Sequence, residues 1–302
     1  MKYRSLTAVL IVCVLTVSQS FAQKPVVGLD CFHNNEPTPH YTWQLTSVGG
    51  FSQCAQLILG LGADTASIQT SPDSAVLAPL KVFIIVDPDD SSESPDPEFV
   101  TPAEADAIDK WVQRGGSLLL LTNNKGNCDL THVNILAAKF GITFNSDTYG
   151  GGADLGPLPA NPLFAGCDTL HIVDMCTQTL VAPAQALFTL GGSVLISTAL
   201  QGNGKVFAMG DPWLYNEYIN SKDNKLCGTN VMKWLLGLTT GVASLRMVPQ
   251  TNVDLQRSST VARTFLPNGR LILNAGQKAS FAHVNACIIV GPAGVSKSIL
   301  IN

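Results

Sequence analysis

Residues 81–86 read KVFIIV, and residues 101–121 read TPAEADAIDKWVQRGGSLLLL. The first segment is an apolar run of strand length. The second opens with a capping box formed by Thr101 and Glu104, with a proline at the first helical position, which predicts the start of a helix. Two glycines end that helix, and SLLLL follows as another buried strand. Strand, helix and strand in this order predict a parallel βαβ unit.

The same alternation continues on both sides of this unit. Further buried strands are predicted at 25–30, 66–69 and 142–144, and further helices at 47–61 and 131–140. Strands that are apolar along their whole length indicate a parallel sheet covered on both faces. We therefore expect an α/β fold.

The segment from 150 to 190 has a different character, because it is rich in glycine, proline and short β-like pieces. It predicts an antiparallel insertion or sheet edge. A hairpin is expected next, from 193–198 and 205–209 around Gly202-Asn203-Gly204. A last helix is predicted at 229–238, with Thr229 as its N-cap.

Both ends of the chain are predicted to differ from this body. Residues 1–22 have a basic start, an apolar run and small residues before a cleavage point, which predicts a signal peptide and a secreted, periplasmic or cell-surface protein. The alternative is a retained anchor, although the run is short for a span. No later stretch is long and apolar enough to span. The α/β domain is assigned to 23–240 and a small β module to 241–302.

Composition and cysteines limit the partners. The chain is 46% apolar and 13% charged, and it has no cluster of Lys or Arg, which argues against disorder and against nucleic acid. Seven cysteines would remain after cleavage, so at least one thiol is free or joins another chain. Cys167 and Cys176 are the expected local disulfide. The spacing does not match a zinc site.

Polar residues gather after four predicted strands. In open α/β sheets ligands bind outside the carboxyl ends of strands, where these residues would meet. Amides, carboxylates, an imidazole and flat aromatic rings suit a sugar, whereas no phosphate-binding glycine motif is present. The same residue types also form turns and caps without any ligand. The predicted ligand-binding residues are Asn34, Asn35, His40, Tyr41, Trp43, Asn124, Asn127, His132, Asp211, Trp213, Tyr215 and Asn216.

Several of these segments carry a family resemblance. GLDCFHNNE, PHYTW, GGFSQ, FIIVDPD, GNCDLTHVNILAAKFGITFN and GDPWLYNEY resemble a domain attached to bacterial unsaturated rhamnogalacturonyl hydrolases, itself similar to class I glutamine amidotransferases. The resemblance covers roughly residues 24–238. It implies a flavodoxin-like three-layer α/β sandwich with a β insertion. The helical-barrel catalytic unit of those hydrolases has no counterpart here.

The resemblance also concerns a nucleophile and the tail. Class I amidotransferases place a catalytic Cys in a tight turn, and the matching turn at 122–126 has none; Cys128, with His132 as its base, is the remaining alternative. The segments 268–273 and 296–302 loosely resemble the β-sandwich sorting domain of type IX secretion, although residues 286–290 replace its Tyr-rich strand. An accessory β module is the other interpretation of this tail.

Three functions follow from these patterns. The first is a non-catalytic carbohydrate-binding accessory protein of pectin (rhamnogalacturonan) degradation, with no cofactor. The second is a glycoside hydrolase that uses paired carboxylates, with Asp30, Glu36, Asp211 and Glu217 as the main candidates. The third is a Ca²⁺-supported binding or structural protein, with Asp87, Asp89 and Asp90 as hard-oxygen ligands.

Overall fold

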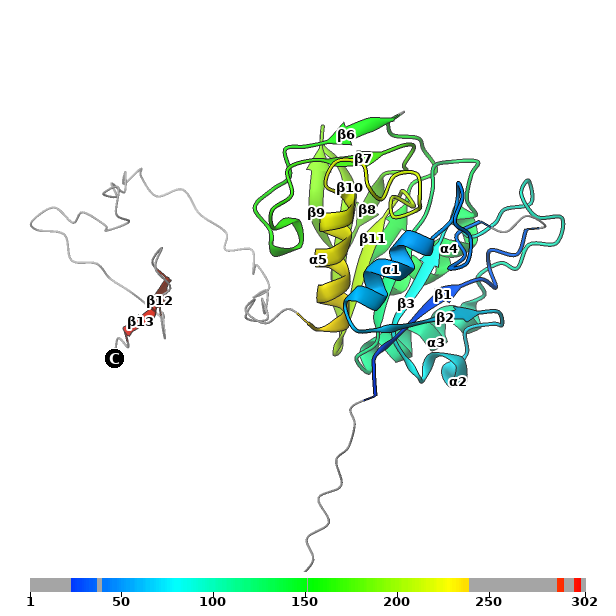
Figure 1. The fold of residues 1–302 in the computed structure, drawn as a ribbon, viewed down its shortest axis with the longest axis horizontal. Coiled ribbons are helices and arrows are strands. Elements are labelled where there is room, and N and C mark those ends of the chain that lie inside the picture. The colour runs from blue at the N-terminus through cyan, green and yellow to red at the C-terminus, as the bar shows by residue number, and fades with distance from the viewer. Residues whose placement is uncertain (1–22, 37–39, 151, 239–286, 291–295, 300–302) are drawn as a thin grey trace, which may run out of the picture. The chain divides into compact units, whose positions relative to one another are not determined.

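The structure, a computed structural model, describes residues 23–36, 40–150, 152–238, 287–290 and 296–299 (Figure 1). The chain divides into two compact units, Met1–Ser244 and Leu245–Asn302. The predicted signal peptide and most of the predicted sorting module lie outside the described residues, and the boundary at 240 stays a prediction. In the second unit, β12 (Cys287–Val290) and β13 (Ser296–Ile299) form an antiparallel pair.

The first unit is built on one large sheet of nine strands. Its strands and the order in which they pair are β2-β1-β3-β4-β11-β10-β8-β5, with β9 paired to β10. The bounds are β1 (Val26–Asp30), β2 (Asp64–Ile68), β3 (Leu80–Val86), β4 (Ser117–Leu121), β5 (Ile142–Phe144), β8 (Gln178–Leu180), β9 (Gln185–Leu190), β10 (Ser193–Gln201) and β11 (Gly204–Met209).

The first five strands of that order are parallel and the rest are antiparallel. The parallel part runs 2-1-3-4 and then β11, which is the strand order of flavodoxin-like folds. The predicted α/β fold class is therefore confirmed. The predicted β insertion is also present, because β8 and β9 extend the sheet on its antiparallel side, and β6 (Ala153–Leu155) pairs with β7 (Leu170–Ile172) apart from it.

Helices cover both faces of the sheet. One apolar cluster packs α1 (Ser52–Gly60) and α5 (Asn224–Leu236) against one face. A second packs α3 (Pro102–Gln113) and α4 (Leu130–Ala137) against the other. Short helices complete the unit, namely α2 (Ser74–Leu77), η1 (Ala138–Phe140) and η2 (Pro162–Phe164). Figure 1 shows α1 and α5 lying together in front of the strands.

The central strand β3 shows how sequence creates the two clusters. Val82, Ile84 and Val86 belong to the α1/α5 cluster, whereas Phe83 and Ile85 belong to the α3/α4 cluster. Side chains alternate along a strand, so an entirely apolar run faces a core on each side. At roughly 25 cal/mol per Å² of buried apolar surface, such residues dominate the stability of the sheet.

Two predicted helix boundaries are wrong. The helix predicted from 47 begins at Ser52, after Gly49 at φ 76° and a turn in which Gly50 N–H donates to Ser47 O. The last helix begins at Asn224, not Thr229. Thr229 lies inside α5, where its hydroxyl donates to Lys225 O at 2.7 Å, so it is not an N-cap.

The predicted disulfide is also absent. Cys167 and Cys176 are free thiols, as are the other cysteines in the described part of the first unit. The Cys176 sulfur lies 3.4 Å from Thr122 Oγ1, while Cys167 neighbours Cys227. Cys167 and Cys176 are close in sequence but lie apart, because the intervening residues form β7 and the connection to β8. None of the described helices is long and apolar enough to cross a membrane.

Candidate functional site at the carboxyl edge of the sheet

The loops that follow β1, β3, β4 and β11 meet at one edge of the sheet, as the sequence predicts. Backbone hydrogen bonds join them in order: Asp89 N–H donates to His33 O at 2.9 Å, Asp87 N–H to Leu121 O at 2.9 Å, and Thr122 N–H to Met209 O at 3.0 Å. These bonds continue the pairing of the parallel strands beyond their ends. The site is therefore positioned by the rigid centre of the sheet.

Asp87 is the most unusual residue at this edge. Its carboxylate is buried, and Oδ2 accepts hydrogen bonds from the Tyr41 hydroxyl at 2.8 Å and from Asn123 Nδ2 at 2.9 Å. Oδ1 has no partner within the described part of the chain. Burial raises the pKa of Asp87 to about 7, although the hydrogen bonds from Asn123 and Tyr41 and the neighbouring Cys128 thiol act in the opposite direction.

Backbone strain marks the same contact. Tyr41 and Asp87 have φ values of 48° and 46°, in the left-handed region that a side chain rarely adopts. Each such residue costs on the order of 1–3 kcal/mol, and strained residues cluster at binding and catalytic sites. Here the two strained residues are joined by a hydrogen bond between their side chains.

Asp211 is a second buried carboxyl at the edge. Its Oδ2 accepts a hydrogen bond from Val173 N–H at 3.0 Å, and Oδ1 is without a partner among the described residues. Burial raises the pKa of Asp211 to about 7; backbone N–H groups, that of Val173 first, act in the opposite direction, and the charge of Asp174 adds to the rise. Two carboxyls that titrate near neutrality thus lie beneath this edge.

Five rings form a row, which we call the aromatic row: His40, Tyr41, Tyr215, Tyr218 and His171. Consecutive ring centroids are 5.8, 5.9, 5.0 and 5.3 Å apart. The first three contacts are edge to face, a favourable arrangement for aromatic pairs. Tyr41 is buried, whereas His40 is exposed and the other three rings are half-buried. The row connects the loop after β1 with the loop after β11.

Electrostatics link the row to the carboxyls beneath it. Burial raises the pKa of Tyr215, and Asp211, Glu217 and Asp87 contribute as nearby negative charges. Burial and Asp87 raise the pKa of Tyr41 in the same way. Both phenols therefore stay protonated at neutral pH and can act as hydrogen-bond donors.

A smaller, partly exposed group lies at the start of α4. The ring of His132 stacks on Phe99 with centroids 4.3 Å apart and planes at 16°. Its Nδ1 pairs with Asp129 Oδ2 at 2.7 Å. Asn127 is exposed and donates to Asn124 Oδ1, while Asn124 itself is buried.

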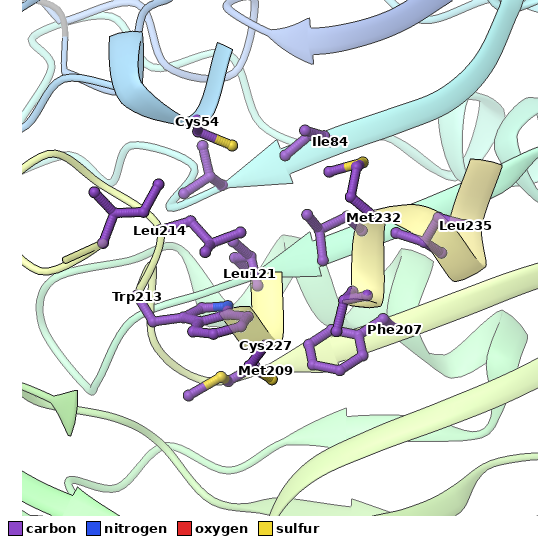
Figure 2. Packing of buried hydrophobic residues seen from close by; sticks show 14 of the residues in the cluster. Cys54, Ile84, Leu121, Phe207, Met209, Trp213, Leu214, Cys227, Met232 and Leu235 are labelled. Atoms are coloured by element: carbon purple, nitrogen blue, oxygen red, sulfur yellow. The ribbon is translucent and has the colours of Figure 1, made fainter. Parts of the chain in front are cut away.

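The predictions for the tryptophans are wrong. Trp213 is 0% exposed and packs in the α1/α5 cluster, where Figure 2 shows it beside Met209 and Leu214. Trp43 is also buried, and its indole N–H donates to Ala66 O at 3.0 Å. Neither ring exposes a face to a ligand, because both pack in the hydrophobic core.

Three of the predicted amides have structural partners. Asn216 Oδ1 accepts Gln53 N–H at 3.1 Å, and Nδ2 donates to the carbonyls of Leu45 and Ser47 at 3.0 Å each. Asn34 is buried and donates to Asp87 O at 3.3 Å. Asn35 is exposed at the edge, although its side chain also bonds to Asp96 O at 3.1 Å.

The candidate catalytic carboxylates are each engaged separately. Asp30 Oδ2 lies 2.6 Å from His33 Nδ1 in a buried pair, and Glu36 lies 2.7 Å from His40 Nδ1. Both oxygens of Glu217 accept Gly49 N–H, at 2.9 and 2.8 Å. Asp211 is bonded to Val173. The four carboxylates therefore each bind a different partner, and no two of them form a pair that would flank one glycosidic bond.

Cys128 does not have the properties of a nucleophile. Its thiol is buried, and burial together with Asp87 raises its pKa well above the usual value. A catalytic cysteine requires the opposite shift, because the thiolate is the reactive form. His132 is held by Asp129 instead.

The aspartates proposed for calcium point to different donors. Asp87 binds Tyr41 and Asn123, Asp89 Oδ2 accepts Asn35 N–H at 2.8 Å, and Asp90 Oδ1 accepts the backbone and hydroxyl of Ser92. Across the described ranges, no group of three or more His, Cys, Asp or Glu residues is arranged to hold a metal ion. The calcium hypothesis gains no support from this arrangement.

Sequence reasoning missed four residues of the site: Phe99, Asn123, His171 and Tyr218. Asn123 and Tyr218 belong to the polar segments after strands that the sequence pattern indicated as ligand loops. Phe99 and His171 come from a loop and an insertion without periodicity, so only the three-dimensional structure brings them to the site.

Comparisons with known proteins define the fold more than the function. No family model and no curated protein matches the chain. Among solved structures, the N-terminal domain of mmIFT52 is similar with a TM-score of 0.58 and 19% identity, over 72% of this chain and 99% of that one. At this identity the likeness concerns the fold alone.

Proteins of the class I glutamine amidotransferase-like fold are also among the structural neighbours. They include a GMP synthase-type protein from Thermoplasma acidophilum (TM-score 0.46, 11% identity, 72% and 94% covered). A ThuA-like protein from Bacteroides uniformis has a TM-score of 0.44 and 14% identity over 72% and 94%. These scores are too low to support an argument about function. The predicted links to rhamnogalacturonyl hydrolases and to type IX secretion stay predictions.

Proposed function

We propose that this protein binds a polysaccharide or oligosaccharide without cleaving it, as a secreted accessory protein of pectin (rhamnogalacturonan) degradation. The aromatic row is the observation that carries the proposal. The pectin link and the export rest on the sequence resemblance and on the predicted signal peptide.

The row has the chemistry that a sugar requires. A pyranose presents apolar C–H faces and a rim of hydroxyl groups, and half-buried tyrosines offer a flat apolar surface with a polar edge. Tyr215 and Tyr218 are half-buried in this way. Asn35 and His40 supply exposed amide and imidazole groups at the same edge.

The carboxylates favour binding over hydrolysis. A glycosidase needs two carboxyl groups that flank one bond, one of them free to donate a proton. The raised pKa of Asp211 is typical of a general acid, but this residue is buried and bonded to the backbone. Glu217, the candidate on the same loop, holds Gly49.

The experiment is a calorimetric titration of the mature full chain with rhamnogalacturonan oligosaccharides, followed by analysis of the same sample for cleaved product. Saturable heat with intact sugar is expected. Tyr215→Ala should weaken binding about tenfold, equivalent to about 1.4 kcal/mol. Tyr149→Ala is the matched control, because Tyr149 is a half-buried tyrosine outside the row.

Two results would contradict the proposal. Cleaved product would show that the protein is an enzyme, with Asp211 and Glu217 as the first candidates for its catalytic carboxylates. Equal affinities for Tyr215→Ala and the unchanged protein would remove the aromatic row from the binding surface.

A further inference from the structure

The loops at the carboxyl edge are strongly acidic. Residues 31–51, 87–101, 122–129 and 211–221 contain ten Asp or Glu residues and one Lys or Arg, which is Lys125. The formal net charge of the whole chain is only −4. Acidic groups, and the formal negative charge that they carry, are therefore concentrated at the edge where the aromatic row lies.

Most of this charge comes from residues 87–98, which we call the acidic loop. Three hydrogen bonds of Asn35 hold the acidic loop against the loop after β1. Asn35 N–H donates to Asp89 Oδ2 at 2.8 Å, and Asn35 Nδ2 donates to Asp96 O at 3.1 Å. The Ser94 hydroxyl donates to Asn35 Oδ1 at 3.0 Å. The Tyr41–Asp87 bond joins the same loop to the aromatic row. The acidic loop thus adjoins one end of the row.

The carboxylates of this loop already repel one another. Burial raises the pKa of Glu93 to about 8, with Asp87, Asp89 and Asp90 adding to the effect. Burial raises the pKa of Asp89 to about 6, with Glu36 adding to it. An anionic ligand placed here would meet the same repulsion.

The nearby basic side chains do little to offset this charge. His33 lies buried between Asp30 and Glu104, at 2.6 and 3.5 Å, and His40 pairs with Glu36. His132 pairs with Asp129, so Lys125 is the remaining positive group in the four loops. Recognition of a carboxylate ordinarily uses Arg or a group of basic side chains.

Buried acceptors point to a donor-rich ligand instead. Asn34 Oδ1, Asp87 Oδ1 and Asp211 Oδ1 are buried and have no partner within the described residues. Hydroxyl groups can donate to such buried oxygens through bridging water, whereas a carboxylate has no proton to donate.

Resting on the function proposed above, we propose that the aromatic row and the acidic loop select uncharged saccharides and disfavour uronate-bearing ones. Within pectin, neutral sugars should then bind more tightly than the galacturonate residues of the backbone, so rhamnogalacturonan oligosaccharides should bind through their neutral sugars.

A matched pair of ligands tests this selection. An oligogalacturonide and its fully methyl-esterified form have the same linkage and length; the ester lacks the negative charges and carries a methyl group on each former carboxylate, and only the effect of charge should depend on salt. Calorimetry on the mature full chain, in EDTA at low salt, should show the ester binding at least about tenfold more tightly. Salt should narrow the gap, because the Debye length shortens from about 30 Å at 0.01 M to about 8 Å at 0.15 M.

A charge variant supplies the second measurement. Asp96 and Glu98 are exposed acids of the acidic loop, and the double variant Asp96→Asn, Glu98→Gln should raise the affinity for the uronate about two- to fivefold. The matched control is Asp64→Asn, Asp109→Asn, which removes two charges from β2 and α3 and should change neither affinity.

The outcomes separate this inference from the proposed function. Equal or tighter binding of the uronate, or a gap that salt does not narrow, overturns the charge selection while sugar binding stands. No binding of the ester, of neutral oligosaccharides or of the uronate overturns the proposed function and the selection together.

Discussion

Trp213 shows how one residue can be misplaced by its sequence surroundings. It stands among Asp, Asn and Tyr residues just after a strand, which is typical of a ligand loop. In the structure its ring centroid lies 6.4 Å from that of Phe207, with the two planes 28° apart, inside the α1/α5 cluster. The loop therefore uses its largest side chain to anchor itself in the core, and the smaller tyrosines stay near the surface.

Replacing Trp213 should cost stability. Trp213→Ala would leave a large cavity and lower the free energy of unfolding by about 3–5 kcal/mol, and Trp213→Phe should lose less because it keeps a ring. Urea unfolding followed by circular dichroism measures both. A loss below about 1 kcal/mol for the alanine variant would be inconsistent with a fully buried ring.

His33 is a second residue whose role is structural. Burial alone would lower the pKa of His33, but the carboxylates of Asp30 and Glu104 outweigh it and raise that pKa from 6.5 to about 10. Burial would raise the pKa of Glu104, but the ion pair with His33 and hydrogen bonds from Ser71 and Thr101 lower it from 4.5 to about 2. The pair joins the end of β1 to the start of α3.

The stability contributed by this pair should depend on pH. The contribution of His33 is fully present below pH 6.5 and is lost as the pH rises through about 10; that of Glu104 is present above pH 4.5 and is lost as the pH falls through about 2. His33→Gln should therefore destabilise most between pH 4.5 and 6.5 and least above pH 10. A destabilisation that stays constant from pH 5 to 10, measured by urea unfolding, would refute the charged pair.

At the scale of elements, α1 and α5 show where local signals fail. Thr229 resembles an N-cap, but α5 begins five residues earlier because Asn224 accepts His171 N–H at 2.9 Å and donates to His171 O at 2.8 Å. α1 begins at Ser52 because Asn216, far along the chain, bonds to Gln53. Such contacts between distant segments leave no pattern within either helix.

Asn216 connects three segments and should be sensitive to change. Asn216→Ala leaves the Leu45 and Ser47 carbonyls and the Gln53 N–H without this partner, so we expect a loss of about 1–3 kcal/mol in the free energy of unfolding. Limited proteolysis should also become faster between residues 45 and 53. The control is Asn220→Ala, an exposed residue with one side-chain bond to Gln53, which should change stability by less than about 0.5 kcal/mol.

Elements with strong local signals were predicted well. The βαβ unit at 81–121, with its capping box, is observed as β3, α3 and β4, and the hairpin at 193–209 as β10 and β11. Both depend on short-range periodicity and turn chemistry. The short helix α2, whose N-cap is Asp73, was missed because four residues give no periodic signal.

At the scale of the whole molecule, it was easier to predict which loops meet at the carboxyl edge of the sheet than which of their side chains face solvent. Strand alternation places Asp30, Asp87, Thr122 and Asp211 at one edge, and the structure brings their loops together. Which side chains there face solvent depends on tertiary packing. Tyr215 remains half-exposed while Trp43 and Trp213 are buried, and no local pattern separates them.

The distribution of thiols gives a prediction for the whole chain. Of the free cysteines in the described part of the chain, Cys167 is half-buried and the others are buried. Burial and Asp223 raise the pKa of Cys167, so its reaction should be slow but faster than that of the rest. Mass spectrometry after maleimide treatment of a native mature Cys287→Ser variant should show one early adduct. Adding Cys167→Ser should abolish it; an early adduct elsewhere would contradict the burial pattern.

The unpaired oxygens of Asp87 and Asp211 have a calorimetric consequence. With pKa values of about 7, each carboxyl is divided between two protonation states at neutral pH. A ligand that donates a hydrogen bond to either oxygen favours the ionised state, so binding releases protons to the buffer. The measured heat should then vary with the ionisation enthalpy of the buffer, and the slope of that dependence counts the protons released.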